Sequence, residues 1–423
     1  MKRFYCIPAL MMVSAGAIAG NAQWYSPSAG DLHTAELATG QAVPPSRHTE
    51  STALNYAWPL SRMPGDAAIA DARVESRQYW VDTTGEALAR GIKLPLSAPG
   101  AVIRVSALEH GSALTLNPQA LELSINGQSV AATEHSGDTS QTELVTGSEL
   151  QAQGMPVPQD SLAFRLPETG AAGTLHMRLA GAPEHLPLVV HVYEPLSPWT
   201  ASLSAPRHNY LSGQSLNLEL ALSDGQNRLP GGSMQALLVS PDADQAWPLE
   251  VGQDGFTLHG PIPAEIPDGP GLFEVHAYVN TTYGDTVIRR DLKLALGIST
   301  SHARFSESAE VNDRGGLTIS LGVEAAVAGR YQVNAEVHGT DALGHLQGLA
   351  MVQSAAVLSA GEGRIRLDVP ADLLIESGLQ PPYEIRNLEL LDQGRMQVLE
   401  SRQRAMKIDT ARTITNPPSG SER

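Results

Sequence analysis

The stretch Ser215–Leu222, which reads SLNLELAL, decides the fold class of this chain. Leucines occupy every second position from Leu216 onward, and Asn217 and Glu219 fall between them. A period of two places the leucines on one face of an extended chain and the polar side chains on the other. The stretch therefore predicts a β-strand with one buried and one solvated face.

Similar short apolar runs surround this strand between residues 196 and 298. Turn signals such as Asp224-Gly225 and Pro230-Gly231-Gly232 separate them. Glycine supplies positive φ values in such turns, and proline presets φ. Strands at this density are typical of an immunoglobulin-like β-sandwich, which we predict for residues 196–298.

Residues 299–410 show the same organisation, with apolar alternation over Leu317–Val323 and Tyr331–Val337. We expect a second immunoglobulin-like domain here. The polar segment 411–423 has no apolar surface to bury, so it is predicted to be a disordered tail.

The N-terminal part, residues 23–195, is less regular. Residues 23–77 form an arm with little periodicity, in which a short helix is expected near Asp66–Glu75, and Thr133–Asp160 is expected to be a loop. Strands between these segments predict a β-sandwich-like domain that carries the arm, joined to the next domain by the proline-containing linker Glu194–Trp199. The chain is therefore predicted to be all-β, with three β-sandwich domains in tandem.

The first 22 residues have the composition of a signal peptide. Met1-Lys2-Arg3 is basic, Ile7–Ile18 is apolar, and Gly20-Asn21-Ala22 supplies small residues for cleavage before Gln23. The apolar run is shorter than the roughly 20 residues of a membrane span, and no later segment reaches that length. The leader predicts that the mature chain is exported and is periplasmic or extracellular. Cys6, the single cysteine, lies within the leader, so the mature chain is expected to contain no thiol.

The charge balance is acidic. The chain has 28 Lys and Arg against 45 Asp and Glu, a formal net charge of −17. Removal of the leader takes away two more positive charges. Phosphate backbones and anionic lipid surfaces repel such a protein, so nucleic acid is not expected as a partner.

Five segments of the C-terminal part are distinctive: Gly329-Arg330-Tyr331, Gly339-Thr340-Asp341, Gln353-Ser354-Ala355-Ala356, Pro382-Tyr383-Glu384-Ile385-Arg386 and Asp392-Gln393-Gly394-Arg395-Met396. With these segments the chain resembles an uncharacterised family of exported bacterial proteins, a domain-of-unknown-function family. The resemblance implies an N-terminal β domain followed by two immunoglobulin-like domains, together with export, and it carries no catalytic residue.

Motifs for catalysis or cofactor binding are missing from the sequence. It contains no G-x-S-x-G for a serine nucleophile, no H-E-x-x-H for zinc and no glycine-rich phosphate loop. His338, Asp341 and His345 could supply metal ligands from one loop, but the segment from Thr340 to Gly344 more simply predicts a hairpin turn. We therefore predict no catalytic residues, no metal and no cofactor.

Aromatic residues gather in the N-terminal part. Flat rings on a β scaffold can stack on the apolar faces of sugars, so Trp58, Tyr79 and Trp80 are the candidate ligand-binding residues. The alternative is that such rings attach the arm to its domain. The set comprises Trp24, Tyr25, Tyr56, Trp58, Tyr79 and Trp80.

The sequence leaves three functions open: binding of a protein, binding of a carbohydrate or polymer, and catalysis at an unrecognised site. The leading hypothesis is a non-enzymatic exported protein that binds another envelope or secreted protein through its immunoglobulin-like domains. This hypothesis predicts an exposed apolar patch or an uncovered edge strand. The alternative is a carbohydrate- or polymer-binding protein, which predicts that Trp58 and Trp80 are exposed and roughly coplanar.

Overall fold

The computed structural model describes residues 21–28, 30–34, 36–40, 42, 51–60, 71–108, 117–134, 141–152, 154, 161–170, 172–229, 232–267 and 270–409. The predicted leader up to Gly20 and the predicted tail 411–423 lie outside these residues. The chain divides into two compact units, one of residues 1–68 with 299–423 and one of residues 69–298. We refer to them as the C-terminal unit and the central unit.

Three apolar cores confirm the predicted all-β, multidomain fold. One core lies in the C-terminal unit and two lie in the central unit, and almost all of their residues come from strands. The period-two alternation predicted for Ser215–Leu222 is present in β16 (Ser215–Ser223), where Leu216, Leu218, Leu220 and Leu222 are buried.

The first domain of the central unit is a sandwich of two sheets, with strand orders β4-β13-β6-β11-β10-β9 and β5-β12-β7-β8. Part of the predicted loop Thr133–Asp160 forms β10 and α2 instead, because Leu144 points into the core. The elements are β4 (Gln78–Thr84), α1 (Gly85–Arg90), β5 (Ile92–Leu96), β6 (Val102–Ala107), η1 (Pro118–Ala120), β7 (Leu121–Ile125), β8 (Gln128–Val130), β9 (Ala132–Glu134), β10 (Thr142–Thr146), α2 (Gly147–Ala152), β11 (Leu162–Arg165), β12 (Gly173–Leu179) and β13 (Pro187–Tyr193).

The middle domain, also in the central unit, is one curled sheet with the order β15-β22-β21-β18-β19-β20-β16-β14-β3, in which β17 pairs with β16. Part of the helix expected near Asp66–Glu75 is strand β3 instead, because Ala72 and Val74 pack on the middle core. The elements are β3 (Ala72–Ser76), β14 (Thr200–Ala205), β15 (Asn209–Leu211), β16, β17 (Arg228–Leu229), β18 (Ser233–Val239), β19 (Ala246–Val251), β20 (Thr257–Pro261), β21 (Phe273–Tyr283) and β22 (Thr286–Ser299).

A buried ion pair joins these two domains. Arg290 of β22 donates to Glu194, directly after β13, with an Nη1–Oε2 distance of 2.6 Å, and both side chains are almost fully buried. The guanidinium also donates to Ser97 and Ser197, and Glu194 accepts from the Ser97 hydroxyl. A charge pair removed from water in this way is stable only with such additional hydrogen bonds.

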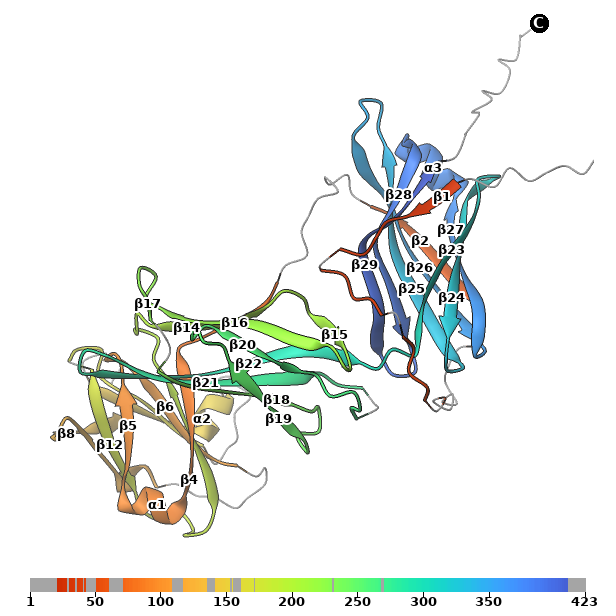
Figure 1. Ribbon diagram of the computed structural model, residues 1–423. Helices are drawn as coiled ribbons and strands as arrows, with labels where there is room; N and C mark the ends of the chain where they lie inside the picture. The colour runs from red at the N-terminus through yellow and green to blue at the C-terminus, as the bar shows by residue number, and fades with distance from the viewer. Residues whose placement is uncertain are drawn as a thin grey trace, which may run out of the picture. The chain divides into compact units, whose positions relative to one another are not determined.

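The C-terminal unit contains a six-stranded sheet, β1-β29-β28-β25-β26-β2, and a three-stranded sheet, β23-β24-β27. Figure 1 shows β1 and β2, in red and orange, among the blue strands of this unit. The elements are β1 (Asn21–Trp24), β2 (Leu54–Pro59), β23 (Ala303–Asn312), β24 (Gly316–Ala325), β25 (Gly329–Thr340), β26 (Leu346–Leu358), β27 (Gly361–Pro370), α3 (Ala371–Ser377), β28 (Gln380–Asp392) and β29 (Gln397–Asp409).

The arm therefore differs from the expectation that it belongs to residues 23–195. Its strands form the two edges of the C-terminal sheet, where Trp24 pairs with Met406 and Trp58 with Met351. Burial explains the placement, because Ala22, Trp24 and Ala57 pack on the C-terminal core. Strand β1 also begins at Asn21, so it includes the last two residues of the predicted leader, Asn21 and Ala22.

Candidate functional site

The outward surface of the six-stranded sheet is the candidate site. Ala350 and Val352 of β26 are fully buried, so Met351 between them faces outward. Val333 and Ala335 of β25 are likewise buried, so Asn334 between them faces outward. We name this surface the aromatic face and define it by Tyr56, Trp58, Met351, Gln353, Asn334 and Glu389.

Two exposed rings at the edge strand β2 dominate the aromatic face. Tyr56 is 53% exposed and Trp58 is 46% exposed. Their ring centroids lie 6.1 Å apart and the ring planes differ by 25°, so the rings form one nearly continuous apolar surface. Met351, directly across from Trp58 on β26, is 41% exposed and extends that surface.

Polar side chains continue from the rings across the sheet. The register places Tyr56 beside Gln353, Gln353 beside Asn334, and Asn334 beside Glu389. Asn334 donates from Nδ2 to Oε2 of Glu389 at 3.3 Å, and Gln332 donates from Nε2 to Oδ1 of Asn334 at 2.8 Å. These bonds fix the orientation of the Gln332 and Asn334 amide groups.

A charged cluster lies on the same sheet beyond these amides. Arg404 donates to both carboxylate oxygens of Glu384 at 2.8 and 2.9 Å, and Arg386 donates to one of them at 2.7 Å. Partial burial of Glu384 opposes its ionisation, but the hydrogen bonds from Arg404 and Arg386 hold the pKa of this carboxyl below its usual value. The two arginines are therefore engaged within the protein.

Tyr79, a predicted ligand-binding residue, is buried in the first domain and does not contribute to a ligand surface. Its hydroxyl donates to the carbonyl of Pro95 at 2.8 Å, and the guanidinium of Arg289 lies 5.1 Å from its ring. Burial raises the pKa of the Tyr79 hydroxyl well above its usual value. The ring is part of the core of the first domain.

Trp80, also predicted to bind ligand, packs within the central unit. Its ring stacks on His191, with centroids 5.1 Å apart and planes 15° apart. Its backbone N–H donates to Asp291 of β22 at 2.8 Å, and its carbonyl accepts from Arg289. Trp58 belongs to the other compact unit, where its stacking neighbour is Tyr56 on the same strand face.

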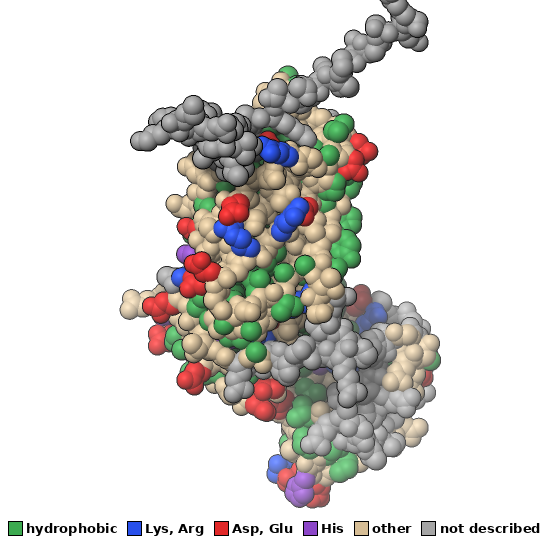
Figure 2. Space-filling view, turned by 90° about the vertical axis from the view of Figure 1, so that its right-hand side faces the viewer, with side chains coloured by type: hydrophobic (Ala, Val, Ile, Leu, Met, Phe, Trp, Pro, Cys, Tyr) green, Lys and Arg blue, Asp and Glu red, His purple; other side chains and the backbone are tan. Residues whose placement is uncertain are grey.

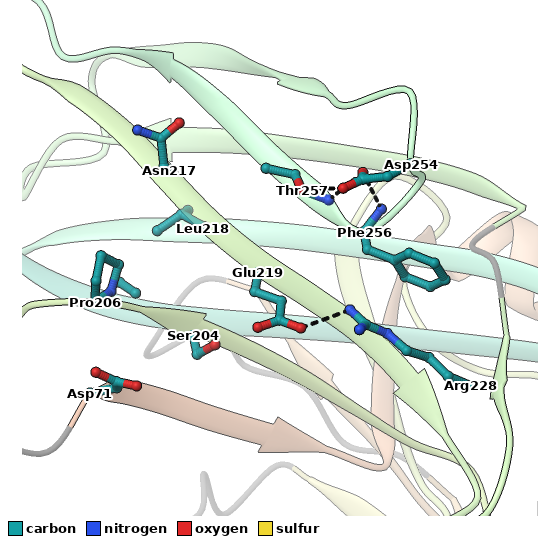
Figure 3. Close-up of a pocket in the computed structure, with 11 residues that line it drawn as sticks. Asp71, Ser204, Pro206, Asn217, Leu218, Glu219, Arg228, Asp254, Phe256 and Thr257 are labelled. Carbon is teal, nitrogen blue, oxygen red and sulfur yellow. Dashed lines mark hydrogen bonds and ion pairs between the residues drawn. The ribbon is translucent and has the colours of Figure 1, made fainter.

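The middle domain has a hollow of about 410 Å³, lined by Asp71, Glu219, Arg228 and Asp254 among other residues. Figure 3 shows Arg228 reaching Glu219 at 3.0 Å, and its guanidinium also lies 4.0 Å from the centre of the Phe256 ring. Asp254 accepts from the Thr257 hydroxyl and from the N–H groups of Phe256 and Thr257, which lowers the pKa of its carboxyl to about 2. This carboxylate caps a turn and is not a poised general base.

The loop at His338, Asp341 and His345 forms the hairpin turn that its sequence predicts. Asp341 accepts from the backbone N–H groups of Leu343 and His345, and Gly344 has φ of 84°. His338 is buried and contacts Glu336, while the His345 ring is largely exposed. Among the residues that the structure describes, no group of three or more His, Cys, Asp or Glu is placed to hold a metal ion.

Within the described part of the chain, no helix is long and apolar enough to cross a membrane. On the face shown in Figure 2, Lys and Arg side chains are few and most lie beside Asp or Glu. The described residues of that face therefore form no basic patch for a polyanion.

Sequence reasoning identified Trp58 and noted Tyr56, but missed Met351, Gln353, Asn334 and Glu389. The alternation of Tyr56 and Trp58 two residues apart was the available signal, since such residues share a strand face. The polar residues carry no signal of their own, because they meet the rings only through pairing across about 300 positions.

Comparisons with known proteins identify a family. The chain matches the N-terminal domain of a domain of unknown function, DUF4785, over residues 45–194, and the C-terminal domain of DUF4785 over residues 302–409. No curated protein matches the chain.

Solved structures support the fold. A DUF4785 family protein from Legionella pneumophila is 17% identical, with a TM-score of 0.71, over 89% of this chain and 98% of that chain. A mutant α2-macroglobulin from Salmonella is 13% identical over 81% of this chain and 24% of that chain, and its TM-score of 0.22 supports no argument. Both family matches and the Legionella structure agree with the resemblance noted in the sequence: the chain belongs to the DUF4785 family.

Proposed function

We propose that this chain is an exported, non-enzymatic binding protein that holds a macromolecule of the cell envelope or the secreted fraction on its aromatic face. The observation that carries the proposal is the exposed patch of Tyr56, Trp58 and Met351. Exposed aromatic side chains on a β-sheet surface are typical anchors of binding sites. The sequence of the first 22 residues supports export.

The leading hypothesis from the sequence, a protein partner, gains support from this exposed apolar patch. Strands β1 and β2 are themselves the edge strands of the six-stranded sheet, and the exposed rings of the aromatic face lie on β2. A binding role is also consistent with the middle hollow, where Arg228 is paired with Glu219 and Asp254 is bound by Thr257.

Site-specific photo-cross-linking in the native host tests this function. A benzoyl-phenylalanine at Met351 on the aromatic face is compared with one at Arg366, which is 66% exposed on β27 of the other sheet. We expect an adduct from position 351 that is absent at position 366 and is lost when Trp58→Ala is added. A protein partner gives a discrete band, and a glycan gives a smear sensitive to glycosidases. Equal adducts from both positions, or none from position 351, would contradict the proposal.

A further inference from the structure

We propose that the ligand of the aromatic face is a neutral glycan chain. This inference rests on the proposed function, because it names the ligand class of the same surface. It is carried by three features together, namely the parallel rings, the oriented amides beside them and the absence of a free cation among the described residues of this face.

The rings provide the apolar half of the recognition. Pyranose rings have a face of C–H groups that packs well on indole and phenol rings. Tyr56 and Trp58 differ by only 25° in plane and their centroids are 6.1 Å apart, so a chain of sugar rings can lie along both. Both side chains are about half exposed, so the apolar surface is available without a conformational change.

The amides and the carboxylate provide the polar half. Sugar hydroxyl groups both donate and accept hydrogen bonds, and amide and carboxylate groups match them. Asn334 uses one amide hydrogen on Glu389 and retains a second, and Glu389 retains further lone pairs. The Gln353 side chain, next to Tyr56, makes no hydrogen bond with other residues in the described part of the chain, so its amide is available to a ligand.

Charge selects a neutral chain over an acidic one. Among the described cations on this side of the sheet, Arg386 and Arg404 bind Glu384, and Lys407 contacts Asp409. The buried Arg330 donates to Gln393 and to the Thr52 carbonyl. Because these cations are already engaged and Glu336 and Glu389 add negative charge to the face, a sulfate, phosphate or uronate group gains no free cation there.

A protein partner fits this surface less well. Stable protein interfaces bury about 800 Å² on each side around an apolar centre that excludes water. Among the described residues next to the rings, the exposed large apolar side chains are Met351 and, farther along β26, Val357. Hydrogen-bonding groups occupy the positions between the rings and β28, which suits hydroxyl-rich ligands better than an apolar partner.

A glycan microarray probed with the labelled mature protein tests the inference. Affinity electrophoresis follows, in gels that contain either the neutral polysaccharide bound on the array or polygalacturonate, which is the acidic probe. Wild type is compared with Trp58→Ala and Trp58→Phe. Tyr193→Ala, which removes a 41% exposed ring from the central unit, is the matched control. Thermal unfolding of each variant verifies the fold.

We expect retardation by a neutral polysaccharide that is about tenfold weaker in Trp58→Ala, intermediate in Trp58→Phe and unchanged in Tyr193→Ala. Absence of any bound neutral glycan, equal binding by folded Trp58→Ala, or a preference for polygalacturonate would overturn the inference. A discrete protein adduct from position 351 together with such a result would leave the proposed binding function intact and reject only the glycan.

Discussion

At the residue scale, the buried pair of Arg290 and Glu194 is the most sensitive point of the central unit. Burial lowers the pKa of the Arg290 guanidinium, and Glu194 opposes that effect. Removing one partner leaves an unpaired charge in a site closed to water. We expect Glu194→Leu to lower the free energy of unfolding by about 3–5 kcal/mol, measured by denaturant titration.

Two variants control this prediction. Replacing both partners, as in Glu194→Leu with Arg290→Met, is expected to restore much of the loss, because no uncompensated charge remains. Glu75→Ala breaks the exposed pair with Arg73, in which both side chains are 57% exposed, and is expected to change stability by less than about 1 kcal/mol. Equal losses in Glu194→Leu and Glu75→Ala would disprove the role of the buried pair.

His191 gives a second prediction at this scale. Burial, with a smaller contribution from Arg104, lowers the pKa of His191 from 6.5 to about 4. The unfolded chain therefore binds the proton more readily, so the stability from this group is present above pH 6.5 and declines as pH falls toward 4. Between pH 7 and pH 4.5, we expect wild type to lose roughly 2 kcal/mol more than His191→Gln, by denaturant titration at each pH.

The control for this pH dependence is His185→Gln, since that residue is exposed. This variant should follow wild type across the pH range. If His191→Gln also follows wild type, the histidine is not the titrating group.

At the element scale, the arm strands complete the C-terminal sheet. Asn55 of β2 accepts from the N–H of Asp368 at 2.9 Å and donates to its carbonyl at 3.0 Å, so one side chain joins β2 to β27 of the other sheet. Without the arm, β26 and β29 become exposed edges. Residues 299–409 alone lack the contacts of Ala22, Trp24 and Ala57 with the core.

We therefore expect fragment 299–409 to be unfolded or aggregated when produced alone. A synthetic peptide of residues 20–60 added in trans should restore a monomeric fold. Size-exclusion chromatography and circular dichroism with and without the peptide measure this. A monomeric fragment whose stability does not respond to the peptide would show that the arm is dispensable.

At the scale of the whole molecule, the first and last described strands belong to the same unit. The chain forms β1 and β2 in the C-terminal unit, builds both domains of the central unit, and returns through β23 to β29. The first and last described strands are paired, with Ala22 opposite Ile408. Processing at the N-terminus therefore affects the C-terminal sheet directly.

If the chain is exported as proposed, the complete strand β1 predicts a mature protein that begins at Gly20, three residues before the Gln23 start expected from the sequence. Cleavage after Ala22 would remove half of β1, whereas cleavage after Ala19, in the sequence Ala17-Ile18-Ala19, keeps the strand whole and has small residues at the positions that cleavage requires. The intact mass of the protein from the periplasm or medium of its host distinguishes the two. A mature chain that starts at Gln23 would contradict the prediction.

The sequence by itself determined the fold class and the core faces. Alternation in segments such as Ser215–Leu222 and Tyr331–Val337 is local, and the period of a strand assigns its buried side without knowledge of its neighbours. The turn at Asp341–His345 was predictable for the same reason, since a carboxylate that accepts from nearby N–H groups and a glycine with positive φ act within a few residues.

Only the tertiary structure decided where the arm belongs and which residues surround Trp58. Strand pairing depends on which apolar surface remains uncovered after the chain has folded, and Trp58 meets Met351 across almost 300 residues. For the same reason Tyr79 and Trp80, close to Trp58 in sequence, pack in the central unit. The candidate site is therefore a product of long-range pairing, which a pattern with a period of two residues does not record.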